Sequence, residues 1–298
     1  MTKVFSRSLM SLAAALSLVA APAFAAPSRN ADPALWVMRD ADTTVYLFGT
    51  VHLLPAGLTW FDDAVAKAFH ASDELQMEIL PIEDPASLAP LIMKLAVDPK
   101  GRTMAQRLPP KDHAAYRTAL TRIGLPVDQL EPLEPWFVTL QASALLYRQA
   151  GYDPKLGAEA ILAEAAKRAG KKLTAFETPK EQFAILDSTP EAEQLMGLRD
   201  LTYKADQQMA LINKVIDHWA QGKVDKAGQL LNEAMKSAPE TARLVLTDRN
   251  ARWAKQLQAR MAQPGTVFVA VGAGHLAGVD SVQDYLTRAG FKIERLAD

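Results

Sequence analysis

Short apolar runs separated by polar connections predict strands near the start of the chain. Residues 35–38 and 44–48 form two such runs, and the polar stretch 39–42 between them suits a hairpin. In residues 59–71 apolar side chains recur at helical spacing, which predicts an amphipathic helix. Apolar and polar residues then alternate over 74–80, a pattern typical of a strand with one exposed face.

Most of the remaining chain is helical in pattern. From residue 85 to residue 263 the helical spacing is broken chiefly at prolines, and the segment 172–176 resembles a single strand. The chain closes with an apolar run over 266–271 that predicts a strand, a helix over 279–289 and a strand over 291–295.

Strands at both ends that enclose a long helical middle predict one α/β (α+β) domain. We expect a central mixed sheet built from the N- and C-terminal strands, with a large, mostly helical insertion at about 82–262. A single domain over residues 26–298 is expected, because no low-complexity linker divides it.

The first 25 residues have the pattern of a secretory signal peptide. Lys3 and Arg7 make a basic start, residues 9–21 are small and apolar, and residues 23–25 form an A-x-A cleavage site. The apolar run is short for a transmembrane span, and no later segment reaches about 18 uninterrupted apolar residues. We therefore expect cleavage after Ala25 and a periplasmic or secreted mature chain without a transmembrane segment.

Charge and composition narrow the possible partners. Removing residues 1–25 deletes two basic residues and no acidic one, which takes the net charge from −1 to −3. Such a chain lacks the basic patch that nucleic-acid binding requires. Because the chain contains no cysteine, thiolate catalysis and cysteine-ligated metal are excluded.

Two of the five histidines, His52 and His275, end the same Gly-x-x-His motif directly after an apolar run. A strand that ends in a glycine turn places the imidazole at the carboxyl edge of a sheet, where α/β folds bind their ligands. Each imidazole could simply hydrogen-bond its own turn. The repeated context favours a shared site instead, because two neutral imidazoles and one carboxylate form a metal-binding triad.

Glu78 is the best candidate for that carboxylate. It ends the strand that follows the first motif across one helix, as a right-handed crossover would place it. This topology brings Glu78 to the same sheet edge as His52. The alternative is a solvated residue on a half-exposed strand, and the alternation with Glu74 and Gln76 supports that reading equally.

A predicted helix over 239–261 carries a polar pair on its apolar stripe. Arg249 and Asn250 stand where the stripe between Leu246 and Trp253 calls for apolar residues. A buried guanidinium needs partners, so one interpretation is a structural salt bridge. The other is that Arg249 reaches the site and binds a carboxylate or a developing oxyanion.

Glu177, at the end of its own short strand, is a plausible partner for Arg249 or a group that supports the site. The three other histidines, His70, His113 and His218, lie in helical stretches without such a motif and are interpreted as surface or packing residues.

Five ordered segments resemble the TraB/GumN family, which includes the pheromone-shutdown proteins and is related to the Tiki proteases that inactivate Wnt. The resemblance covers essentially all of the mature chain. Its landmarks are residues 45–53 (VYLFGTVHL), 75–79 (LQMEI), 176–182 (FETPKEQ), 248–250 (DRN) and 271–276 (VGAGHL).

The resemblance implies metal-dependent peptide hydrolysis in a fold shared with the erythromycin-esterase and ChaN-like groups. His52, His275 and Glu78 would bind a divalent transition metal, and Mn, Co, Fe or Zn would each suit this donor set. Glu78 and Arg249 would be catalytic, with Asn250 and Glu177 in contact with substrate.

Three functions remain open at this point. The first is an exported metallohydrolase that acts on peptides. The second is a non-catalytic periplasmic protein that binds and sequesters a peptide or a small signal in the same pocket. The third is a metal-free, esterase-like hydrolase in which a histidine is the general base.

Overall fold

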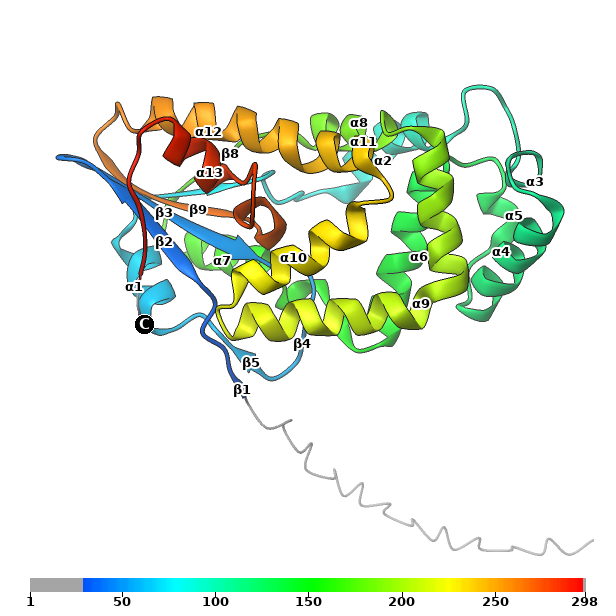
Figure 1. Cartoon of the computed structure of the whole chain (residues 1–298), viewed down its shortest axis with the longest axis horizontal. Coiled ribbons are helices and arrows are strands. Elements are labelled where there is room, and N and C mark those ends of the chain that lie inside the picture. Colours follow the sequence, from blue (N-terminus) through cyan, green and yellow to red (C-terminus); the bar gives the residue numbers. More distant parts are fainter. Residues whose placement is uncertain (1–28, 297–298) are drawn as a thin grey trace, which may run out of the picture.

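The computed structural model describes residues 29–296, so the predicted signal peptide lies outside the described part. Within this range the main sheet has six strands in a mixed arrangement (Figure 1). In spatial order they are β10 (Ile293–Arg295), β2 (Leu35–Arg39), β3 (Thr43–Thr50), β9 (Gly265–Gly272), β6 (Glu74–Met77) and β8 (Lys172–Ala175).

The predicted hairpin is confirmed as the antiparallel pair β2–β3, and β10 adds antiparallel to the other edge of β2. The remaining pairs are parallel, with β9 inserted between β3 and β6. Thr50 of β3 lies opposite Gly272 of β9, and Met77 of β6 lies opposite Ala270. The carboxyl ends of three strands from distant parts of the sequence therefore lie side by side.

The predicted exposed face of β6 is wrong, because all four residues of this strand are buried. β9 and β8 flank the strand on its two sides. Apolar side chains also cover both faces of the sheet, with α1 (Asp63–Ala71) and α7 (Ala158–Arg168) on one face. The other face is covered by α12 (Asp248–Arg260) and α13 (Val282–Arg288). The strand also ends at Met77, so Glu78 lies immediately beyond it.

Helices of the middle of the chain form a second core at the end of the molecule away from the sheet (Figure 1). Buried Tyr116, Leu120, Val138 and Leu198 belong to it. Besides α7, the helices of the middle of the chain are α2 (Pro85–Ala96), α3 (Met104–Arg107), α4 (Pro110–Arg122), α5 (Val127–Leu130), α6 (Pro135–Gln149), α8 (Pro179–Asp187), α9 (Glu191–Ala220) and α10 (Val224–Met235). The second core is built from α3, α4, α5, α6 and α9, whereas α10 packs beside the sheet, where Val224 clusters with Ala34 and Ala277.

The longest of these helices, α9, connects the two cores. It bends at Lys204, whose backbone is not helical, and returns to the sheet (Figure 1). There Trp219 is buried, and its Nε1 donates a hydrogen bond of 2.7 Å to the carbonyl of Gly49 in β3. In the described range, no helix combines the length and apolar character needed to cross a membrane.

Two predicted helices differ from the structure in their details. The helix expected from residue 59 begins only at Asp63, because β5 (Leu58–Thr59) pairs with β1 (Arg29–Asn30). The helix expected over 239–261 is divided into α11 (Pro239–Ala242), a π turn η2 (Arg243–Thr247) and α12. Short pieces complete the chain: β4 (Leu54–Pro55), β7 (Tyr152–Asp153), η1 (Pro154–Leu156) and η3 (Ala273–Leu276).

Candidate functional site

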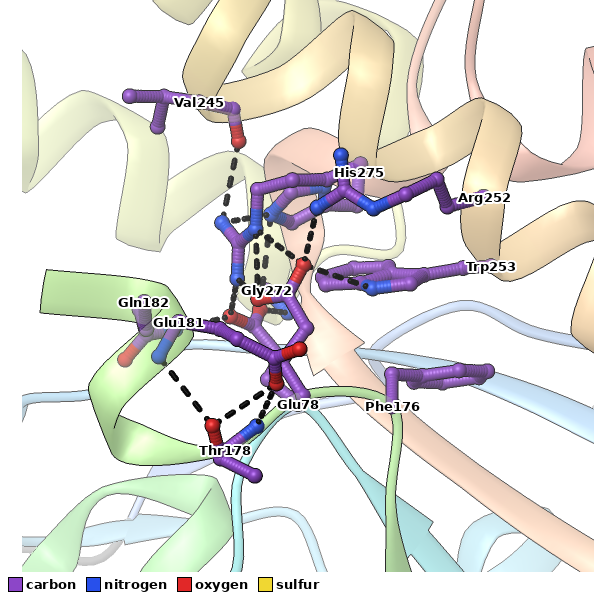
Figure 2. A network of polar contacts seen from close by, with 12 residues as sticks. Glu78, Phe176, Thr178, Glu181, Gln182, Val245, Arg252, Trp253, Gly272 and His275 are labelled. Carbon is purple, nitrogen blue, oxygen red and sulfur yellow. Dashed lines mark hydrogen bonds and ion pairs between the residues drawn. The ribbon is translucent and has the colours of Figure 1, made fainter. Parts of the chain in front are cut away.

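His52, His275 and Glu78 gather at the carboxyl edge of β3, β9 and β6. Their meeting point is Gly272, whose missing Cβ would lie 3.1 Å from Glu78 Oε1 and 3.6 Å from His275 Cδ2. His52 Nε2 lies 3.9 Å from the same point. The structure thus brings the three predicted residues together around one glycine, and Figure 2 shows Glu78, Gly272 and His275 in close proximity.

The glycines of both motifs allow this close packing. A Cβ at Gly49 would lie 3.1 Å from the Cα of Ala273, where the second motif passes over the first. A Cβ at Gly272 would occupy the space that the three side chains share. The motif therefore requires glycine because backbone and side chains approach closely there.

Glu78 is a buried carboxylate held by three donors. Its Oε1 accepts from the backbone N–H of Gly272 at 2.7 Å, and its Oε2 accepts from Arg249 Nη2 at 2.7 Å and from Gln182 Nε2 at 3.1 Å. Burial raises the pKa of Glu78, but the charge on His275, which is protonated only in the acid range where Glu78 titrates, and the charge on Arg249 lower it more, so the pKa falls to about 2. Glu78 is therefore ionised at neutral pH and fixed in orientation.

Arg249 is the hub of a buried network that includes Glu78, Val245 and His275, which Figure 2 labels. Its Nε donates to both oxygens of Glu177 at 3.0 and 3.1 Å, and its Nη2 reaches Glu78. Its Nη1 donates to the carbonyl of Val245 at 3.0 Å, inside the π turn. The guanidinium also lies 4.6 Å from the centre of the Trp253 ring. The structural interpretation of Arg249 is confirmed, because the guanidinium forms buried ion pairs with Glu177 and with the site carboxylate Glu78. Its contact with a substrate carboxylate or an oxyanion stays a prediction.

Asn250 fixes the proton on His275. Asn250 Nδ2 donates to the carbonyl of Asp280 at 2.8 Å, so its Oδ1 must face the ring. Nδ1 of His275 lies 2.6 Å from that oxygen and carries the proton, which leaves a lone pair on Nε2. Burial lowers the pKa of His275 to about 4, although Glu78 opposes the shift, so the ring is neutral.

His52 has a different partner, Glu159 in the first turn of α7. Its Nδ1 lies 2.6 Å from Glu159 Oε1, which also accepts from Thr50. The charge of Glu159 raises the pKa of His52, and the side chain is 69% exposed. The start of α7 packs directly on this loop, since a Cβ at Gly157 would clash with the carbonyl oxygen of His52.

A cavity of about 540 Å³ opens beside these residues. His52, Glu78, Glu159 and Gln182 form its polar side. Its other walls are mostly apolar and come from the segment after β6 and from α7: Met77, Ile79, Leu80, Pro81, Ile82, Ala160 and Ala163, with Glu164 and Lys167 beside them. Of the predicted site residues, His52 and Glu78 line this cavity, whereas His275, Arg249, Asn250 and Glu177 do not.

His52, His275 and Glu78 are chemically suited to bind a metal ion, but their side chains are not arranged around a single metal position. Over residues 29–296, no three His, Cys, Asp or Glu side chains are grouped so that they would hold a metal ion. Arg249 Nη1 instead lies 3.2 Å from His275 Nε2. Still, both imidazoles have Nδ1 held by an oxygen atom, which is the arrangement that orients metal-binding histidines. The space at Gly272 lies among all three donors.

Sequence analysis missed two residues of the site, Glu159 and Gln182. Both lie on helices and have no motif of their own, although Gln182 belongs to the segment 176–182 that carries the family resemblance. A capping box at Thr178 and Glu181 starts α8 and so places Gln182 beside Glu78. Of the remaining histidines, His113 pairs with Glu131 in the helical part at 2.7 Å.

Comparisons with known proteins give a family and a relative for this chain. Residues 34–295 match the model of the TraB/PrgY/gumN family. The chain is also 24% identical over 298 residues to an uncharacterized protein of Treponema pallidum (strain Nichols). That match covers 88% of this chain and 84% of the Treponema protein.

Proposed function

The chain belongs to the TraB/PrgY/gumN family, and from this premise we propose that it is an exported, metal-dependent hydrolase of peptides. The observation that carries the proposal is the matched pair of imidazoles. Each has its Nδ1 held by an oxygen, and both lie with Glu78 around Gly272, beside the cavity that His52 and Glu78 line. Such prior orientation is what a metal site requires of its ligands.

His52, His275 and Glu78 would hold the metal, for which Mn, Co, Fe and Zn are the candidates. When bound, the ion would polarise a carbonyl and lower the pKa of a water molecule. Glu78 contributes an ionised carboxylate at the cavity wall, which can bind the metal or accept a proton. Arg249 holds that carboxylate in place and balances its charge.

The roles of Asn250 and Glu177 follow from their contacts. Asn250 orients His275, and Glu177 binds Arg249 together with Arg252 Nη2 at 2.9 Å and Trp253 Nε1 at 3.1 Å. We assign both a positioning role, because neither lines the cavity in which a peptide would bind.

A metal-dependent peptide assay tests this proposal. Purified protein is stripped with a chelator, supplied with Mn, Co, Fe or Zn, and incubated with a quenched fluorescent peptide library. We expect turnover with at least one metal, and loss of both metal and turnover in the His52→Ala/His275→Ala variant. No turnover with any of the four metals would overturn the proposal.

A binding protein is the second candidate, because no metal-holding group is assembled within residues 29–296. In that case the library assay would give peptide binding by the wild-type chain without cleavage. Export is tested separately through the mass of the mature chain, which should begin at Ala26; a chain that keeps Met1 would contradict it.

A further inference from the structure

The polar wall of the cavity contains a hydrogen-bond acceptor that no other described residue uses. Most of the other polar groups there are already engaged. Three donors hold Glu78, and His52 Nδ1 faces Glu159. Lys167 Nζ pairs with Glu83 at 2.9 Å. Glu159 Oε2 is buried without a hydrogen-bond partner, but the other oxygen of this carboxylate pairs with His52. Gln182 also has an unused acceptor, because only the end of its amide that faces Glu78 has a partner.

The orientation of the Gln182 amide follows from its neighbour. Glu78 is ionised and can only accept hydrogen bonds, so the group that faces its Oε2 at 3.1 Å must be Nε2. The carbonyl oxygen Oε1 is then the other end of the amide. It accepts no hydrogen bond from any residue in the range 29–296.

A ligand that fills the cavity beside Glu78 therefore meets an acceptor and should supply a donor. A peptide bond carries an N–H next to its carbonyl, whereas an ester has an oxygen at that position. The ester oxygen would turn its lone pairs toward Oε1 and would leave this acceptor without a donor in the complex. Gln182 can therefore distinguish these two classes of acyl compound.

We propose that Gln182 Oε1 accepts a hydrogen bond from the N–H of the substrate's scissile amide, so that the site selects amides over esters of the same shape. This inference rests on the proposed hydrolase function, since it names the substrate class of the same cavity. It makes Gln182 a specificity residue that touches the substrate with one end of its amide and Glu78 with the other.

The test compares two substrates that differ in one atom. One is a blocked alanine tetrapeptide, and the other is its depsipeptide, in which oxygen replaces the N–H of the central bond. Intrinsic ester reactivity cancels when the ratio of the two kcat/KM values is compared between protein variants. In Gln182→Met, we expect the amide-to-ester ratio to fall about three- to tenfold, the usual effect of one neutral hydrogen bond.

The same ratio separates a structural role from recognition. If Gln182 only supports Glu78, Gln182→Met lowers both rates equally, and an unchanged ratio overturns the inference. Gln182→Lys keeps a donor toward Glu78 but lacks the acceptor, so it should lower the ratio as well. Gln207, an exposed glutamine of α9 outside the cavity, provides the control, and Gln207→Met should leave the ratio unchanged.

The experiment gives a different result if the protein is not a hydrolase. If the wild-type chain cleaves neither compound with any metal, the proposed function is overturned, and the inference is tested by calorimetry with the same two compounds. Tighter binding of the peptide by wild type, with the preference reduced in Gln182→Met, supports it. Equal affinity ratios in the two proteins overturn it.

Discussion

His52 and His275 end the same four-residue motif, yet the fold gives the two rings opposite surroundings. The side chain of His275 is 6% exposed and bonds a neutral amide, whereas that of His52 is 69% exposed and bonds a carboxylate. The pKa of His275 is lowered by burial, and that of His52 is raised by Glu159. The motif thus fixes where each imidazole lies, while neighbouring helices decide its charge and access.

This difference divides the site into a fixed half and an accessible half. His275, Arg249 and Glu177 belong to a buried network whose members satisfy one another. His52 lies at the cavity, where substrate and solvent can reach it. Changes in the fixed half should therefore alter stability, and changes in the accessible half should alter chiefly binding.

Loss of Arg249 should give the largest effect on stability. Arg249→Met leaves Glu78 and Glu177 buried without their shared countercharge, which typically costs about 3–5 kcal/mol. Arg252 also binds Glu177 but is 50% exposed, so Arg252→Met should cost less than about 1 kcal/mol. Urea denaturation of both variants measures the contrast, and equal losses would refute the division into two halves.

Substitution of the residue that binds each ring should also cost more stability in the fixed half than in the accessible half. Asn250→Ala leaves the buried Nδ1–H of His275 without an acceptor, which costs about 1–3 kcal/mol. Glu159→Gln keeps an acceptor for the exposed His52 and should change the free energy of unfolding by less than about 1 kcal/mol. Titration with metal ions should also show about ten- to a hundredfold weaker affinity in Asn250→Ala. A larger loss of stability in Glu159→Gln would reverse the comparison.

In the metal-free protein, the two histidine rings should make stability depend on pH in opposite directions. The pKa of His275 falls from 6.5 to about 4 on folding, so the unfolded chain binds more protons between these values. Stability from this ring is present above pH 6.5 and is lost as the pH falls toward 4, by about 2–3 kcal/mol.

His52 acts in the other direction, because folding raises its pKa. The stability that this ring contributes is lost as the pH rises above the ordinary pKa of histidine. Solvent screens this ring, so its effect should be the smaller of the two. Urea denaturation between pH 4 and 8 tests this in wild type and His275→Gln. A variant with the same acid-side slope as wild type would show that another group causes the slope.

Asp280 should give the smallest effect. Its backbone is left-handed, with φ of 58°, and its carbonyl holds Asn250. Asp280→Gly accepts that conformation and should cost less than about 1 kcal/mol, whereas Asp280→Ala should cost about 1 kcal/mol more. Long-range ¹H–¹⁵N spectra should show the Nδ1-protonated tautomer of His275 in the glycine variant. A shift to the Nε2-protonated form would mean that the Asp280 side chain, and not only its backbone, controls the ring.

The sequence predicted the site better than it predicted the sheet around it. Both histidine motifs, Glu78 and the Arg249–Glu177 pair could be identified, because glycine turns and a polar pair on an apolar stripe are local patterns. The position of β9 between β3 and β6 could not be derived, since it depends on pairing between segments about 200 residues apart. The burial of β6 on both faces could not be derived either, since it depends on helices that pack on the two sides of the sheet.

Local sequence patterns do not predict which helical residues contribute to the site. Glu159 and Gln182 act only because α7 and α8 dock against the strand ends, and the docking depends on contacts such as that of Gly157 with the His52 loop. The π turn before Arg249 was also missed, because a single turn with i→i+5 hydrogen bonds leaves no clear trace in an apolar stripe.

The central place of β9 also has a consequence for biosynthesis. The ribosome makes residues 265–272 long after β3 and β6, yet they separate these two strands and provide the pairing surface for both. Until they emerge, the two earlier strands lack their native neighbour, and the nascent chain cannot close its sheet. The sheet should therefore form slowly, since its decisive contacts join segments about 200 residues apart.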